Sequence, residues 1–183
     1  LDWDGDPIRQ TDRFDRYRDV IHLLMDTNRV YPCVCSRKDI RESVGAPHGM
    51  SDTAYPGTCR GRFASFTDAS EHAIHGNPPA LRFITNTPDY AHGDPLDTPL
   101  NPDDDVVFDD RFAGRKRFHH GRLNGDFVIA KDIDTPSYQL ANVVDDYDFG
   151  VTDIVRGDDL LPSTAQQLTL IHALNYPTPN YVH

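Results

Sequence analysis

Apolar residues recur at helical spacing in two long segments of the chain. In residues 11–28 the apolar side chains fall three or four positions apart, with Arg and Asp on the opposite face, which predicts an amphipathic helix with Thr11 as its N-cap. A last helix is predicted from the pair Ser163-Thr164, as its cap, through residue 174, and Pro177 ends it. These are the two best-defined elements in the pattern.

The rest of the chain alternates short strands with polar connections. Ser36 and Asp39, three positions apart, predict the start of a short helix. Residues 138–144 fit two descriptions, because adjacent valines favour a strand while other residues keep helical spacing. Segments 45–67 and 85–105, rich in turn-forming residues, predict loops. Apolar runs predict strands at 81–84, 106–108, 127–129 and 154–155. Strands interleaved with helices predict an α/β fold.

Composition narrows the class of protein. The 183 residues are 38% hydrophobic and include 18 Lys and Arg against 29 Asp and Glu, a net charge of −11. This length suits one domain, or one domain with a small insert. No apolar run approaches the roughly 18 residues of a membrane span, so we expect no membrane association. The acidity excludes a histone-like coat of positive charge but allows a local basic face. Both ends resemble the interior of a fold, so we expect a segment of a longer protein.

The three cysteines cluster, which favours a metal site over disulfides. Cys33, Cys35 and Cys59 fall within 27 residues, and an odd, clustered set is a poor disulfide framework. Structural zinc needs four ligands, and chemistry alone favours a neutral imidazole beside thiolates. The nearby candidates for the fourth ligand are His48, His72, His75 and Tyr55. The alternative is that the three are ordinary buried cysteines.

One stretch of the acidic chain is basic. Residues 111–122 include His119-His120 and two aromatic residues, Phe112 and Phe118, that offer stacking faces. A basic, aromatic stretch of this kind predicts RNA contact. The alternative is a strand-loop-strand surface whose arginines pair with nearby Asp residues, from Asp103 to Asp110. The basic residues predicted to contact RNA are Arg111, Arg115, Lys116 and Arg117.

A series of motifs in order along the chain resembles the catalytic domain of class I glutamyl-tRNA synthetases. The most specific are YQLANVVDD at 138–146 and IVRGDDLL at 154–161. The others are LDWD at 1–4, RQTDR at 9–13, VYPC at 30–33, YPGTCR at 55–60, PALRF at 79–83 and FVI at 127–129. The resemblance covers essentially the whole chain, which makes it more specific than any single motif.

Two details are similar to one branch of that family, the glutamyl-queuosine tRNA(Asp) synthetases, which lack an anticodon-binding domain. The first is the branch's zinc pattern, Cys-x-Cys followed by Tyr-x-x-x-Cys, which Cys33, Cys35, Tyr55 and Cys59 match. The resemblance therefore implies a tyrosine, not a histidine, as fourth ligand; a nearby dication favours the phenolate form. The second is DLLPST at 159–164, similar to the branch's Asp-Leu-Leu-x-Ser-Thr.

The resemblance also shows departures from the family. Ala165-Gln166 stands where the family has Pro-Arg. The ATP-binding HIGH and KMSKS motifs are missing from residues 1–183. We therefore expect the parent protein to be active and this segment alone to be inactive.

The resemblance implies a ligase that activates glutamate with ATP, accompanied by Mg²⁺, and transfers it to the queuosine base in the anticodon of aspartate tRNA. It implies that Tyr138 and Arg156 contact the glutamate. Arg156 follows a predicted strand, where an open α/β sheet places its ligands, and its guanidinium suits a carboxylate. No side chain here is expected to act as a nucleophile. The alternatives are an ion pair of Arg156 with Asp158 or Asp159, and a core position for Tyr138.

The resemblance further implies a division of the chain. Residues 1–30 and 136–183 are expected to belong to a Rossmann-type catalytic domain, and residues 31–135 to a zinc-containing α+β insertion. We expect a cytoplasmic monomer. Two other functions stay open: part of an ordinary glutamyl-tRNA synthetase that charges tRNA 3′ ends, and a non-catalytic, zinc-stabilised RNA-binding module.

Overall fold

The N-terminal helix forms where its apolar stripe predicts it, but it begins later. The computed structural model describes residues 5–43, 54–73, 76, 78–85, 105–119, 123 and 125–183. A 3-10 turn, η1 (Gln10–Arg13), leads into α1 (Phe14–Asp26), and the residue before α1 makes no side-chain cap. Thr11 lies inside this turn, so its prediction as N-cap was wrong. Arg13 Nε donates to Asp145 at 2.7 Å, and this contact with a distant helix holds the turn.

Residues 138–144, whose pattern fits a strand or a helix, are part of a helix. The last helix begins earlier than predicted. α5 (Tyr138–Asp148) has Ser137 as N-cap, whose hydroxyl accepts a 3.5 Å hydrogen bond from the Leu140 amide. α6 (Leu161–Ala173) has a proline in its first turn, which suits that position. Thr164 therefore lies inside α6, and its prediction as part of the cap was wrong. Its hydroxyl takes part in side-chain hydrogen bonds instead.

Two short helices flank the cysteine region. α2 (Arg37–Ser43) begins with the predicted reciprocal cap: the Asp39 amide donates to Ser36 Oγ at 3.2 Å, and the Ser36 amide donates to Asp39 Oδ2 at 2.7 Å. α3 (Phe66–Glu71) was not predicted, and its first two residues fall in the predicted loop. Ser65 caps α3 by accepting from the Asp68 amide at 3.0 Å.

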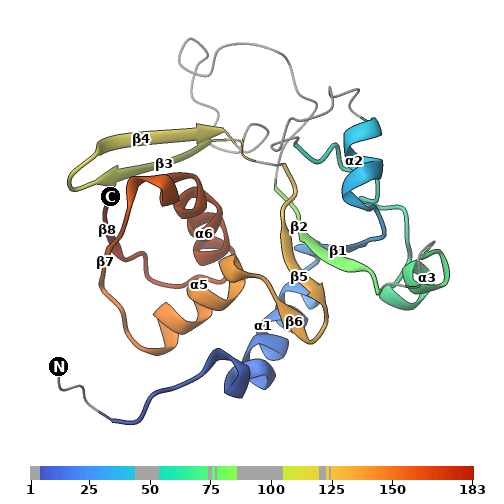
Figure 1. The fold of residues 1–183 in the computed structure, drawn as a ribbon, viewed down its shortest axis with the longest axis horizontal. Coiled ribbons are helices and arrows are strands. Elements are labelled where there is room, and N and C mark those ends of the chain that lie inside the picture. The colour runs from blue at the N-terminus through green and yellow to red at the C-terminus, as the bar shows by residue number, and fades with distance from the viewer. Residues whose placement is uncertain are drawn as a thin grey trace.

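The first sheet is antiparallel and carries the start of the cysteine region on its edge strand (Figure 1). The predicted strands at 81–84 and 127–129 form its two central members: the first is shifted by one residue, and the second begins one residue later and extends three residues further. Neighbouring strands are antiparallel throughout. The order is β1 (Val30–Cys33), β2 (Ala80–Phe83), β5 (Val128–Asp132) and β6 (Thr135–Pro136).

The second sheet is mixed. Its order is β4 (Gly114–His119), β3 (Asp105–Asp110), β8 (Asn180–Val182) and β7 (Asp153–Val155). The hairpin β3–β4 is antiparallel, whereas β7 and β8 run parallel and are joined through α6, as in a βαβ unit. β3 also pairs in parallel with β8, so this sheet joins strands from both sides of residue 135. The mixed second sheet and the interleaved helices confirm the α/β class.

One apolar core joins both sheets to the long helices. Tyr17 of α1, Phe83 of β2, Leu140 of α5 and Leu168 of α6 are among its buried members. In Figure 1, α5 and α6 lie beside the second sheet while α2 and α3 lie beyond the first. A smaller buried cluster surrounds the cysteines. Among the described helices, none is long and apolar enough to cross a membrane.

Candidate functional site

Three thiols and one phenol converge at the end of β1. Cys33 ends that strand, Cys35 follows it, and Cys59 lies in a turn; all three are free thiols. Their Sγ atoms lie within 4.8 Å of one another, and those of Cys35 and Cys59 are 3.4 Å apart. The Tyr55 hydroxyl lies 3.4 Å from Cys33 Sγ and 3.8 Å from Cys35 Sγ. The structure therefore brings all four sequence-predicted ligands together.

This arrangement fits a tetrahedral zinc ion. Sulfur ligands about 2.3 Å from zinc lie about 3.8 Å from one another at tetrahedral angles, close to the spacing found here. Burial and the hydrogen bond with Cys59 raise the pKa of the Cys35 thiol to about 12. Burial and the neighbouring thiols raise the pKa of Tyr55 as well. A dication among these groups reverses both effects, because zinc binds the thiolate and phenolate forms.

A buried cation supports the phenol. The Arg82 guanidinium carbon lies 3.7 Å from the centroid of the Tyr55 ring, and Arg82 is only 8% exposed. Its Nη1 donates to the Asp126 carbonyl at 2.6 Å, which fixes its position. The Cys59 amide also donates to the Tyr55 hydroxyl, at 2.8 Å. Both contacts favour negative charge on the phenol oxygen.

The histidine candidates do not replace the tyrosine in the described part of the chain. His72 is exposed, and its Nδ1 lies 2.8 Å from the Asp68 carbonyl oxygen, within its own helix. His48 and His75 lie outside the described residues. The phenol is the fourth group that the structure places beside the three sulfur atoms.

A buried carboxylate ties the cysteine turn to the first sheet. Asp126 is 2% exposed and accepts from the Tyr31 hydroxyl at 2.6 Å and from the Thr85 amide at 2.8 Å. Arg60, the residue after Cys59, donates its Nε to the same carboxylate at 2.8 Å and makes a second contact through Nη2. No local sequence pattern predicts this network, because the partners of Asp126 are 41 or more positions away.

The guanidinium of Arg156 is held entirely by neutral side chains. Arg156 directly follows β7, at the carboxyl end of a parallel strand pair. Its Nε donates to His183 Nε2 at 3.1 Å, and its Nη2 donates to Thr164 Oγ1 at 2.6 Å and Gln167 Oε1 at 2.7 Å. Among the described residues no carboxylate forms an ion pair with it, so the alternative of a pair with the acids just after it was wrong. Its charge therefore stays available to an anionic ligand.

Tyr138 lies at the start of α5 and is 52% exposed, which excludes the alternative of a core aromatic. Its neighbour Gln139 donates to Ser163 Oγ at 3.2 Å and to Gln166 Oε1 at 3.0 Å, both near the start of α6. The same turns of α6 hold Arg156. Tyr138 is not among the hydrogen-bond partners that the structure gives Arg156; it is its neighbour Gln139 that contacts the start of α6.

The sequence motifs did not indicate two buried residues linked to Arg156: His183, which contacts it, and Asp110, which contacts His183. His183 Nδ1 lies 2.7 Å from Asp110 Oδ2, and both side chains are 0% exposed. Burial opposes ionisation of Asp110, but hydrogen bonds from the Ala113 and Phe112 amides and from His183 lower its pKa well below the usual range. A signal was present, because an Asp at the end of a strand often receives turn amides. Its link to the last residue of the chain had no local signal.

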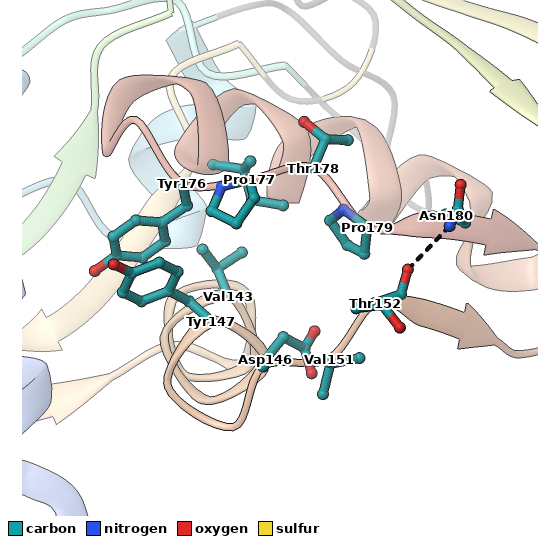
Figure 2. Close-up of a pocket in the computed structure, with 12 residues that line it drawn as sticks. Val143, Asp146, Tyr147, Val151, Thr152, Tyr176, Pro177, Thr178, Pro179 and Asn180 are labelled. Carbon is teal, nitrogen blue, oxygen red and sulfur yellow. Dashed lines mark hydrogen bonds between the residues drawn. The ribbon is translucent and has the colours of Figure 1, made fainter.

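A separate cavity of about 280 Å³ lies between the end of α5 and the segment before β8 (Figure 2). Thr152, just before β7, and Asn180, at the start of β8, line it, as does the stacked pair Tyr147 and Tyr176, whose ring centroids are 3.6 Å apart. These residues lie at the amino ends of β7 and β8, whereas Arg156 lies at the carboxyl end. The cavity is therefore distinct from the predicted glutamate site.

Comparison with known proteins decides the family. Residues 1–183 match the family model described as tRNA synthetases class I (E and Q), catalytic domain. The chain belongs to this family. Its architecture, with one antiparallel and one mixed sheet, agrees with the α/β class that the sequence predicted.

Curated relatives of this class I synthetase chain are named Glutamyl-Q tRNA(Asp) synthetase. The protein of Symbiobacterium thermophilum is 38% identical over 193 residues, which cover 100% of this chain and 54% of the relative. That of Nocardia farcinica is 38% identical over 186 residues, covering 100% and 51%. That of Rhodopirellula baltica is 39% identical over 196 residues, covering 100% and 53%. The chain spans about half the length of the curated relatives it matches.

Solved structures share the fold of this synthetase chain. A glutamate tRNA ligase from Elizabethkingia meningosepticum, crystallised with its amino acid, has a TM-score of 0.69 and 22% identity, over 98% of this chain and 34% of its own. The glutamate-tRNA synthetase of Elizabethkingia anophelis has a TM-score of 0.69 and 23% identity, over 97% and 34%. At this identity the similarity shows the fold.

The described part of the predicted basic segment, residues 111–119, forms the turn and β4 of the β3–β4 hairpin, while residues 120–122 lie outside the described residues. Two of its four predicted RNA contacts are engaged in ion pairs. Arg111 Nη1 lies 2.9 Å from Asp153 Oδ1, and Arg117 Nη2 lies 2.7 Å from Asp105 Oδ2. Phe118 packs against the core, whereas Phe112 is 83% exposed at the hairpin turn. The remaining basic residues on the hairpin are Arg115 and Lys116.

Proposed function

We propose that the chain is part of a glutamyl-queuosine tRNA(Asp) synthetase of the cytoplasm. The whole protein would condense glutamate with ATP, supplied with Mg²⁺, to glutamyl-adenylate and pyrophosphate. It would then transfer the glutamyl group to the queuosine base in the anticodon of aspartate tRNA. The family match over residues 1–183 and the curated relatives support this assignment. The segment alone is proposed to be inactive and the whole protein monomeric.

The observation that carries the proposal is the environment of Arg156. Three hydrogen bonds to neutral acceptors orient its fork at the carboxyl end of β7, where open α/β sheets bind ligands. Those bonds use the Nε hydrogen and both Nη2 hydrogens, so Nη1 is the nitrogen left to donate to a carboxylate of glutamate, and no ion pair with a described carboxylate competes for it. We propose that Tyr138, exposed at the start of α5, forms a wall of the same site.

The sulfur and phenol cluster is proposed to hold a structural zinc ion through Cys33, Cys35, Tyr55 and Cys59. Zinc there would supply a cross-link between the end of β1 and the turn that contains Cys59, and no chemical step. The proposed division of the chain keeps residues 31–135 as the zinc-containing insertion in a Rossmann-type catalytic domain.

RNA contact is proposed for the β3–β4 hairpin, whose Arg115 and Lys116 lie on opposite faces of β4. Because Arg111 and Arg117 are engaged in ion pairs, Arg115 and Lys116 are proposed to meet the phosphates, with Phe112 as a stacking surface.

A transfer assay on the full-length protein tests the function. Radiolabelled glutamate and ATP are supplied with aspartate tRNA that contains queuosine, and with the same tRNA lacking it. We expect label only on the queuosine-containing tRNA, and removal of the 3′-terminal adenosine from that tRNA should leave labelling intact. Label on both tRNAs that is lost after this removal would indicate an ordinary glutamyl-tRNA synthetase. RNA binding without any label would indicate a non-catalytic module.

A further inference from the structure

A chain of hydrogen bonds from three separate elements ends on Arg156. Asp110 ends β3, His183 follows β8, and Arg156 follows β7. Asp110 Oδ2 lies 2.7 Å from His183 Nδ1, and His183 Nε2 accepts from Arg156 Nε at 3.1 Å. The carboxylate and the imidazole are both 0% exposed. Their burial makes the geometry rigid, because leaving any of these polar groups without its partner is costly.

The donors and acceptors assign the imidazole tautomer. A guanidinium only donates, so His183 Nε2 must carry a lone pair toward Arg156. The ring proton is then on Nδ1, where it is donated to Asp110. Asp110 itself is fixed by the Phe112 and Ala113 amides, which donate to its Oδ1 at 2.9 and 2.7 Å. Hydrogen bonds thus run in sequence from the hairpin turn to Asp110, from Asp110 to His183, and from His183 to Arg156.

We propose that Asp110 and His183 are positioning residues that hold the Arg156 guanidinium in the orientation that binds glutamate. This inference rests on the proposed function, because it assigns the geometry of that same site. Asp110 selects the tautomer, His183 presents its lone pair, and the guanidinium plane is set by that contact together with Thr164 and Gln167. The arginine therefore meets a carboxylate without reorganising, which is how preorganised donors increase affinity and rate.

Asp110→Asn tests the tautomer selection in the full-length protein. The asparagine carbonyl still accepts the two turn amides, but its NH₂ group faces His183 Nδ1. Neutral His183 then carries its proton on Nε2, directed at the Arg156 N–H, and the contact is lost. A carboxylate-to-amide change beside a histidine acts in this way in serine proteases. Asp109→Asn, the exposed neighbour on β3, is the matched control.

Two substitutions of His183 separate its two contacts. His183→Gln places an amide near the Nε2 position and keeps an acceptor for Arg156. His183→Asn places an amide near the Nδ1 position, keeps the contact with Asp110 and removes the acceptor. A merely structural role predicts equal damage from both, whereas a positioning role predicts that only His183→Asn weakens glutamate binding.

Glutamate-dependent ATP–pyrophosphate exchange supplies the kinetic constants. We expect Asp110→Asn and His183→Asn to raise KM for glutamate by about tenfold or more, with KM for ATP changed less than about twofold. We expect His183→Gln and Asp109→Asn to stay within about threefold of wild type. An unchanged KM for glutamate in Asp110→Asn would overturn the inference. So would a parallel rise for ATP and glutamate with a lowered melting temperature in both His183 variants.

Nitrogen NMR of histidine- and arginine-labelled protein separates this inference from the function on which it rests. We expect His183 to show the Nδ1-protonated tautomer in wild type and the Nε2-protonated tautomer in Asp110→Asn, with a shifted Arg156 Nε–H signal. A wild-type enzyme without glutamate-dependent exchange would refute the proposed function, while these signals would still decide the positioning. An Arg156 signal that does not respond to Asp110→Asn would refute the positioning itself.

Discussion

The buried carboxylate of Asp126 offers the sharpest test of how the cysteine turn is held. Its two oxygens accept from the Tyr31 hydroxyl, the Thr85 amide and hydroxyl, and the Arg60 guanidinium. Asp126→Ala removes this acceptor: the Arg60 cation loses its counter-ion and keeps its hydrogen bond to the Thr85 carbonyl, and the buried Tyr31 hydroxyl loses its acceptor. We expect the full-length protein to lose stability, and the turn next to Arg60 to loosen before the rest of the molecule.

The magnitude follows from the exposure of the partners. Removing one partner of a fully buried ion pair costs about 3–5 kcal/mol. Arg60 retains 35% side-chain exposure and regains water when the carboxylate is lost, so the lower part of that range applies. The unsatisfied Tyr31 hydroxyl, 7% exposed as a residue, adds about 1 kcal/mol or more. We therefore expect Asp126→Ala to lower the free energy of unfolding by about 4 kcal/mol.

Urea unfolding measures this loss, and a double-mutant cycle assigns it. Arg60→Ala alone leaves the buried carboxylate without its cation, so the double variant should cost less than the sum of the two single variants. Asp19→Ala, an exposed acid of α1, is the control and should change stability by less than about 0.5 kcal/mol. A loss below about 1 kcal/mol for Asp126→Ala, or strictly additive single variants, would contradict this account of the network.

Three further predictions concern the metal, the RNA and the pH. Cys59→Ser should reduce bound zinc from about one equivalent to less than about half, and equal zinc in the variant and the wild type would refute the site. Removing zinc from the wild type with a chelator should speed deuterium exchange first in residues 54–62. Arg115→Ala and Lys116→Ala should each weaken RNA binding and lower the slope of log K against log salt concentration by about one. Arg117→Ala should chiefly lower the melting temperature; a larger loss of RNA binding in Arg117→Ala than in the other two variants would exclude this assignment. Ion pairs with two arginines lower the pKa of Asp148, so the stabilisation that it provides is complete above about pH 4 and is lost as the pH falls through the lowered pKa. Asp148→Asn should lower the free energy of unfolding by about 1 kcal/mol at neutral pH and make it less dependent on pH in acid; an unaltered pH dependence would exclude this role.

The elements predicted correctly are those that depend on residues close together in the sequence. The apolar stripe of α1 and the reciprocal cap between Ser36 and Asp39 depend only on residues within a few positions of each other. Helix starts that depend on distant contacts were misplaced. Arg13 binds Asp145 of α5, and Thr164 binds Arg156, so tertiary hydrogen bonds outweighed the capping preference of threonine at both helices.

The metal ligands show what a family pattern adds to chemistry. Imidazole is the usual partner of thiolates, so chemistry alone favoured His48, and only the resemblance pointed to Tyr55. The structure supplies the physical reason that a phenol suits this position. The Arg82 guanidinium lies over its ring and the Cys59 amide donates to its oxygen, and both favour the anionic form that binds a metal. A buried arginine 27 positions after a tyrosine carries no local signal of this contact.

The environment of Arg156 could not be read from its neighbours in sequence. Asp158 and Asp159 are the closest acids along the chain, but both are exposed in the 3-10 turn after β7. The crossover through α6 instead brings Thr164, Gln167 and His183 onto the carboxyl end of that strand, 8, 11 and 27 positions away. The exposed carboxylates of Asp158 and Asp159 reduce the electrostatic attraction of Arg156 for an anion only weakly. The three neutral acceptors fix the orientation of its guanidinium without neutralising its charge. The anion-binding capacity of this arginine is therefore a consequence of the parallel strand connection, and changing the acids beside it should affect glutamate affinity far less than changing His183.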